Sequence, residues 1–136
     1  MITIKRKILS RQLKIAEYTL PGYIFNIPNK ENKVFLTFDD GPVKNETEWV
    51  LDLLKKYEAK ATFFCVGENV MKNPDIYKRI IEEGHSIGCH TYNHLNSWKI
   101  SNDEYISSIK KAKELITTNL FRPPYGRLRP AVKKVI

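Results

Sequence analysis

The chain has 136 residues, which is enough for one domain with a sizeable hydrophobic core. Hydrophobic residues make up 42% and charged residues 28%, a balance typical of a globular protein and not of a disordered one. The formal net charge is +8, but the basic side chains are spread along the chain, so no nucleic-acid interface is expected. No run approaches the roughly 18 to 20 continuous apolar residues that cross a bilayer, so no transmembrane segment is expected either.

Residues 1–32 are expected to form a separate lead-in segment, ahead of a domain that spans residues 33–136. A basic amphipathic helix is predicted over about residues 5–18, where it could lie on a partner or on a membrane surface. Lys14 and Glu17 interrupt its apolar residues, which makes it a poor signal-peptide core. The sequence therefore leaves the location open between the cytoplasm and the cell envelope.

The two cysteines, Cys65 and Cys89, lie in apolar runs and neither belongs to a CxxC pair. We predict free, buried thiols and neither a disulfide framework nor a structural zinc site. Cys89 is accordingly left out of the predicted site.

The domain alternates between apolar runs and helical patterns. Strands are predicted at residues 34–38, 61–66, 86–90 and 120–122, the last cut short by Pro123 and Pro124. Helices are predicted at residues 46–57, 74–83, 102–119 and 131–136, with Asn73 capping the second and Ser101 or Asn102 the third. This order predicts an α/β fold with a parallel sheet of βα units. A closed barrel needs about eight strands, so the chain forms either a small open sheet or part of a barrel.

Two adjacent acids, Asp39 and Asp40, follow the first predicted strand and precede Gly41. The carboxyl end of a parallel strand is where α/β folds bind ligands. The simpler interpretation is a polar turn. The alternative is a bound cation, since paired carboxylates are costly unless their charge is compensated.

His90 and His94 are the candidate partners of these acids, at the end of the third predicted strand and in the turn after it. Two imidazoles and one carboxylate form a standard catalytic zinc set that leaves a position for water. The remaining carboxylate could then take a proton from that water, which describes metal-assisted hydrolysis. His85 precedes the same strand and is expected to make structural hydrogen bonds.

Residues 122–126, with the sequence RPPYG, form a third candidate element. They could be a rigid loop after a strand. Alternatively, Arg122 pairs with a carboxylate of the site, and the prolines hold a backbone N–H towards a developing oxyanion.

The motifs TFDDGP, HTYNH and RPPYG, in this order and at these intervals, resemble the first three motifs of the polysaccharide deacetylase family. This family is carbohydrate esterase family four, with the nodulation-type deacetylase domain. Residues 61–64 and 83–88 also resemble it, so the similarity runs from about residue 33 to residue 126. It implies about the first half of a distorted (β/α)7 barrel.

The resemblance implies a role for each matching residue. Asp39 matches the general base and Arg122 the residue that orients it. Asp40, His90 and His94 match the ligands of a divalent metal, zinc in the first instance, with cobalt or another divalent ion as the alternative.

The resemblance also implies a substrate and a reaction. The backbone N–H of Tyr125 matches the oxyanion donor, and Pro124 and Tyr125 are expected to contact the substrate. The reaction would remove N-acetyl groups from N-acetylglucosamine-containing polysaccharide or oligosaccharide, such as peptidoglycan or chitin.

The sequence departs from the family pattern after Tyr125. The family has two further motifs downstream, one of which supplies a histidine as general acid, whereas no histidine follows His94 here. An alternative is therefore a catalytically incomplete half-domain that binds metal or a partner and needs C-terminal motifs for activity. Such a half-barrel is expected to associate with itself through an open sheet edge. A small flavodoxin-like sheet without metal is a third interpretation.

Overall fold

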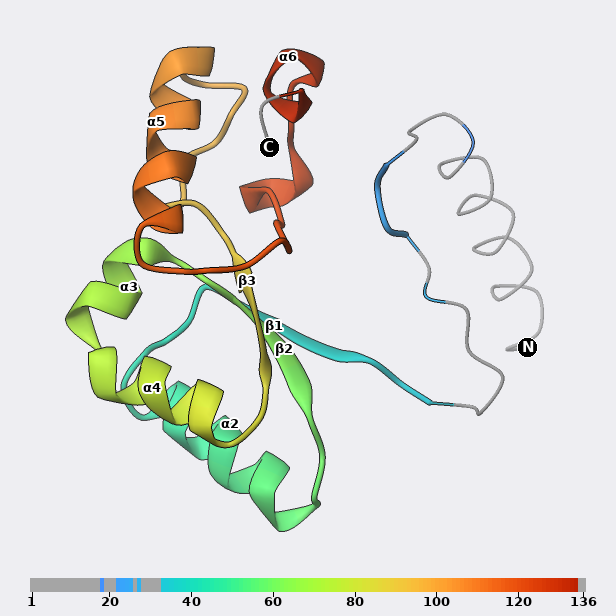
Figure 1. Ribbon diagram of the computed structural model, residues 1–136, viewed down its shortest axis with the longest axis vertical. Coiled ribbons are helices and arrows are strands. Elements are labelled where there is room, and N and C mark those ends of the chain that lie inside the picture. The colour runs from blue at the N-terminus through green and yellow to red at the C-terminus, as the bar shows by residue number, and fades with distance from the viewer. Residues whose placement is uncertain (1–17, 19–21, 26, 28–32, 135–136) are drawn as a thin grey trace. The chain divides into compact units, whose positions relative to one another are not determined.

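The computed structural model describes residues 18, 22–25, 27 and 33–134. The chain divides into two compact units, Met1–Val34 and Phe35–Ile136. The predicted N-terminal helix over about residues 5–18 falls almost wholly outside the described residues. In the first unit the rings of Tyr23 and Phe25 stack with centroids 5.9 Å apart. The elements below all belong to the second unit (Figure 1).

Three parallel strands form the sheet of the second unit, in the order β1 (Leu36–Asp39), β2 (Ala61–Cys65) and β3 (Ser86–Cys89). Asp39 is level with Phe64, and Phe64 is level with Gly88. The carboxyl ends of all three strands therefore meet at one edge of the sheet (Figure 1). This arrangement confirms the predicted α/β fold with parallel strands.

Two helices cover one face of the sheet, α2 (Glu46–Lys56) and α4 (Pro74–Glu82), and they pack against each other (Figure 1). Because successive side chains of a strand point to opposite faces, every second strand residue joins the core beneath these helices. That core consists of Leu51, Leu54, Ala61, Phe63, Cys65, Val70, Ile76, Ile80 and Ile116. The other sheet face carries the side chains that lead to the site.

The remaining elements differ in part from the sequence predictions. Helix α3 (Gly67–Lys72) was not predicted, because a glycine follows the β2 strand and Val66 offers no capping side chain. Helix α5 (Asn102–Lys113) ends earlier than predicted. It packs against α6 (Pro130–Lys133) around Tyr105, Ile109 and Val132.

The predicted fourth strand is reduced to a single bridge between Cys89 and Phe121. Pro123 and Pro124 follow at once and lack the N–H groups that a longer ladder requires. The chain enters a 3-10 turn, Pro124–Gly126, in place of a strand.

Both predicted N-cap positions are confirmed, but only one of the two residues caps its helix with a side-chain bond. The Ser101 hydroxyl accepts the Glu104 N–H at the start of α5. The Asn73 side chain makes no capping bond to α4 and donates instead to the carbonyls of Pro42 and Asn69. Asn73 thus ties the start of α4 to the loop after β1.

Both cysteines are free and buried, as predicted. Burial raises the pKa of Cys65 to about 12 and also raises the pKa of Cys89, so both thiols stay protonated at neutral pH. Among the described residues, no helix is both long and apolar enough to span a bilayer. β1 forms one edge of the described sheet, with Leu36 exposed, and the expected self-association through such an edge stays a prediction.

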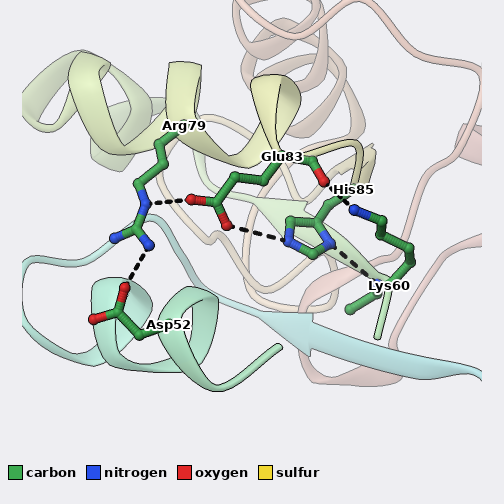
Figure 2. Close-up of polar contacts among 6 residues, drawn as sticks. Asp52, Lys60, Arg79, Glu83 and His85 are labelled. Carbon is green, nitrogen blue, oxygen red and sulfur yellow. Dashed lines mark hydrogen bonds and ion pairs between the residues drawn. The ribbon is translucent and has the colours of Figure 1, made fainter. Parts of the chain in front are cut away.

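His85 anchors a polar network at the amino end of the sheet (Figure 2). Its Nδ1 accepts the Ala61 N–H at 3.3 Å, which ties the start of β3 to β2 and bears out the predicted structural role. Its Nε2 lies 3.9 Å from Glu83 Oε2. Glu83 in turn accepts from Arg79 at 2.6 Å, and Arg79 also pairs with Asp52.

The hydrogen bond to Ala61 holds His85 in its neutral form. A ring nitrogen that accepts a backbone N–H cannot also carry a proton, so protonation would break the bond. Burial, and secondarily the nearby Lys60 ammonium, lower the pKa of His85, and Glu83 opposes them only in part.

We expect the free energy of unfolding of the metal-free protein to fall as the pH drops below about 6.5, the ordinary histidine pKa. The folded-state pKa of His85 is lower than this value, so between the two values the unfolded chain binds more protons. Stability therefore rises with pH across that interval and loses nothing more from His85 below the folded-state pKa. Urea unfolding at a series of pH values measures the effect.

The matched variant is His85→Asn, whose amide oxygen can accept the Ala61 N–H and does not titrate. Burial also lowers the pKa of His90, so the informative quantity is the difference between the two pH profiles. Parallel pH profiles for the wild-type protein and the variant would contradict the assignment of this pH dependence to His85.

Candidate active site

An open pocket of about 500 Å³ lies at the carboxyl edge of the sheet. The pocket is lined by the end of β1, by the loops after β1 and β3, and by the 3-10 turn. This lining brings together most of the residues singled out in the sequence. They are Asp39, Asp40, His90, His94, Arg122, Pro123, Tyr125 and Gly126.

Asp40, His90 and His94 form a three-residue cluster that could hold a metal ion. Asp40 Oδ1 lies 3.4 Å from His90 Nε2 and 3.1 Å from His94 Nε2, and the three donor atoms all lie within 4.8 Å of one another. Two donors that are each about 2.1 Å from a tetrahedral ion lie about 3.4 Å apart. The distances from Asp40 to the two histidines therefore suit one divalent ion.

His90 has the protonation state that metal binding needs. Its Nδ1 lies 2.6 Å from the carbonyl oxygen of Arg122, and a carbonyl only accepts, so Nδ1 carries the hydrogen. Burial lowers the pKa of His90 despite this bond, so the ring is neutral at neutral pH and Nε2 presents a lone pair. That lone pair faces a carboxylate oxygen of Asp40 with no hydrogen between them, an arrangement that a cation would satisfy.

His94 is placed by its loop and by ring contacts. Its backbone has a φ of 53°, and its ring lies 5.0 Å from the His90 ring and 4.8 Å from the Tyr125 ring. A non-glycine residue with positive φ is uncommon and often belongs to a functional site.

Asp39 lies beside the cluster and is bound by Arg122. Arg122 Nη1 donates to Asp39 Oδ1 at 2.6 Å and to Thr37 Oγ1 at 2.9 Å. The guanidinium carbon lies 3.9 Å from the centre of the Phe64 ring. A planar guanidinium that both stacks and donates has little freedom to turn, so the Asp39 carboxylate is held in one orientation.

Gly88 makes room for this stack. It lies on β3 beside Phe64, and a Cβ atom added to it would come within 2.4 Å of the Phe64 ring. The glycine lets the ring lie close to the sheet, under the Arg122 side chain.

The 3-10 turn departs from the expectation for Pro124. Pro124 is fully buried and does not line the pocket, whereas Pro123 does. A substrate contact by Pro124 is therefore not supported, because its side chain is buried away from the pocket lining. Tyr125 lines the pocket, is largely exposed and has a φ of 60°.

Sequence reasoning missed four residues that support the pocket. Thr37 and Phe64 bind Arg122, and Asn69 donates to the backbone carbonyl of Asp40 at 2.6 Å. The fourth is Pro123, which lines the pocket. The sequence signal nearest to these residues is Gly88, since a glycine inside a strand often marks a close approach by another group.

Comparisons with known proteins identify the family of the chain. The family model described as polysaccharide deacetylase matches residues 26–136. A peptidoglycan-N-acetylglucosamine deacetylase of Bacillus cereus is 46% identical over 113 residues, which cover 79% of this chain and 41% of that protein. The crystal structure of the Bc1960 peptidoglycan N-acetylglucosamine deacetylase matches with a TM-score of 0.80 and 41% identity, over 88% of this chain and 59% of that one.

A fourth comparison includes a metal. A family 4 acetyl xylan esterase from Clostridium thermocellum, solved with a cobalt ion, matches with a TM-score of 0.67 and 35% identity, over 75% of this chain and 53% of that one. The chain spans about half the length of these relatives.

Alanine at His90 or at His94 is expected to weaken binding of Co²⁺ and Zn²⁺ by more than about 100-fold. Loss of a residue that only supports a ligand already costs about 10- to 100-fold, so loss of a ligand itself should cost more. Calorimetric titration with the metal alone measures this directly.

The control is His85→Asn, because His85 is the third histidine and lies in the network at the amino end of the sheet. Its metal affinity should equal that of the wild-type protein. Unchanged affinity in either alanine variant would remove that histidine from the cluster.

Proposed function

We propose that this chain, which belongs to the polysaccharide deacetylase family, carries the metal site and the general base of a metal-dependent N-deacetylase. The observation that carries the proposal is the division of the two adjacent acids. Asp40 lies against His90 and His94, whereas Asp39 is held by Arg122. One carboxylate is thus placed to bind a cation, and the other is placed to accept a proton beside it.

The proposed substrate is an N-acetylglucosamine-containing glycan, with peptidoglycan as the first candidate and chitin as the second. This choice is supported by the named activities of the relatives, which include Bacillus cereus peptidoglycan-N-acetylglucosamine deacetylase and a Saccharomyces cerevisiae chitin deacetylase. Because peptidoglycan lies outside the cell membrane, we also propose that the protein acts at the cell envelope.

Asp40, His90 and His94 would hold the divalent ion, with zinc as the first candidate and cobalt as the second. When bound there, the ion would supply Lewis-acid chemistry, which polarises the acetamide carbonyl and makes water a better nucleophile. These ligands contribute one negative charge and two neutral imidazoles, so a divalent ion would keep a net positive charge at the reacting centre.

Asp39 takes the proton of the attacking water in this proposal. Its orientation is set by the 2.6 Å hydrogen bond from Arg122, so the carboxylate does not have to reorganise as the reaction proceeds. The backbone N–H of Tyr125 would donate to the oxyanion that forms at the acetamide carbonyl. The C–N bond then breaks to give acetate and a free amine, which must gain a proton.

The leaving amine needs a proton donor, and this requirement favours a second candidate function. The sequence has three histidines. Two are in the proposed ligand set, and His85 is bound to Ala61 at the other end of the sheet. The chain alone would then be a metal-binding half-domain that needs a further group to complete the reaction.

Asp39→Asn is expected to keep the metal affinity of the wild-type protein and to slow acetate release by at least about 100-fold. The amide cannot act as a base, and general-base catalysis contributes about 10² to 10⁴ in rate. Acetate released from N-acetylated peptidoglycan glycan strands by the full-length protein is the measured quantity, with Asp52→Asn as a matched carboxylate variant outside the pocket.

The outcomes separate the two candidates. Full activity in Asp39→Asn, with normal activity in Asp52→Asn, would exclude Asp39 as the base. Tight metal binding without acetate release by the wild-type chain would favour the half-domain.

A further inference from the structure

The loop between β3 and α5 carries both histidines of the proposed metal site in a strained conformation. Thr91 has a φ of 65° and His94 a φ of 53°. Positive φ is particularly unfavourable for a β-branched residue such as threonine. A loop of this kind keeps its shape only where neighbouring groups hold it.

Helix α3 supplies the first support. The N–H groups of Gly67 and Glu68 donate to the carbonyls of Thr91 and Tyr92, at 3.0 and 2.8 Å. A Cβ atom on Gly67 would lie 2.6 Å from the Tyr92 ring, so the glycine allows this close approach. These two hydrogen bonds hold the backbone carbonyls of Thr91 and Tyr92 in place.

Ser108 of α5 supplies the second support. Its hydroxyl accepts the Tyr92 N–H at 3.1 Å and donates to Asn93 Oδ1 at 2.7 Å. Ser108 is buried, and serine is a poorer helix former than alanine, so helix stability does not explain its presence. One turn later, Lys111 Nζ lies 3.7 Å from the centre of the Tyr92 ring.

The two histidines depend on this loop to different degrees. The His90 N–H donates to the carbonyl of Cys65, and its ring is bonded to the backbone of Arg122. Among the described residues, the ionic and ring interactions of the His94 side chain are with other side chains, namely Asp40 and the rings of His90 and Tyr125. The direction of the His94 side chain therefore depends on the loop backbone at residues 91–93.

We propose that Ser108 is a positioning residue of the metal site, which fixes the Tyr92–Asn93 backbone and thereby aims His94 at the metal. This inference rests on the metal site of the proposed function. Ser108 acts on the ion through the loop, as an outer-shell residue acts on a ligand.

Ser108→Ala is expected to weaken binding of Co²⁺ by about tenfold or more, the usual effect of losing an outer-shell partner. Calorimetric titration with Co²⁺ alone measures the affinity, and the visible absorption of the bound ion reports its ligand geometry. Circular dichroism of the metal-free protein confirms that each variant is folded at the temperature of the titration.

Three variants test whether the hydroxyl itself is responsible. Ser107→Ala changes the neighbouring, exposed serine of the same helix and should leave affinity unchanged. Ser108→Thr keeps a hydroxyl and should restore most of the affinity. Asn93→Ala removes one of the two bonds at an exposed position that does not disturb the core, and should weaken binding in the same direction.

A purely structural role for Ser108 would lower stability and leave the affinity of the folded protein unchanged. Wild-type affinity and an unchanged cobalt spectrum in both Ser108→Ala and Asn93→Ala would therefore overturn the inference. Failure of the wild-type protein to bind Co²⁺ would overturn the proposed metal site itself, which is a distinguishable result.

Discussion

The site depends on a backbone turn at Asp40. Successive residues of a strand point to opposite faces, so an unbroken strand would send Asp40 towards the helices that cover the sheet. Asp40 instead has a φ of 68°, which aspartate tolerates better than most residues, and the Asn69 side chain holds its carbonyl. Because of this turn, the two adjacent carboxylates contact different partners.

Arg122 links these two parts of the site. Its guanidinium binds Asp39 and Thr37, while its backbone carbonyl accepts the hydrogen of His90 Nδ1. One residue thus fixes both the orientation of the proposed base and the tautomer of a proposed metal ligand. The position of Arg122 depends in turn on the Phe64 ring. The ring can lie there because residue 88 is a glycine, which has no Cβ atom to clash with it.

The sequence was sufficient to predict the parts of the fold that local chemistry determines. Apolar runs located β1, β2 and β3 to within one or two residues, and the parallel order then placed Asp40, His90 and Arg122 at one edge. The supporting contacts were not predictable in the same way. Phe64 and Ser108 act through partners that only the strand register and the helix packing bring near. Helical spacing places Ser108, and not Ser107, on the buried side of its helix, but it does not identify Tyr92 and Asn93 as the partners of Ser108.

The predicted fourth strand is as short as its two prolines led us to expect, and its shortness also shapes the site. Apolar residues 120–121 start the strand, and the proline pair limits pairing to one bridge at Phe121. Pairing at that point nevertheless fixes the chain at Arg122, whose N–H donates to the Cys89 carbonyl at 3.0 Å.

Beyond that bond the chain is free of the sheet, so Tyr125 can turn back over His94. A longer strand would have carried the tyrosine away from the pocket. The site therefore requires the short strand and the proline turn, just as it requires the backbone turn at Asp40.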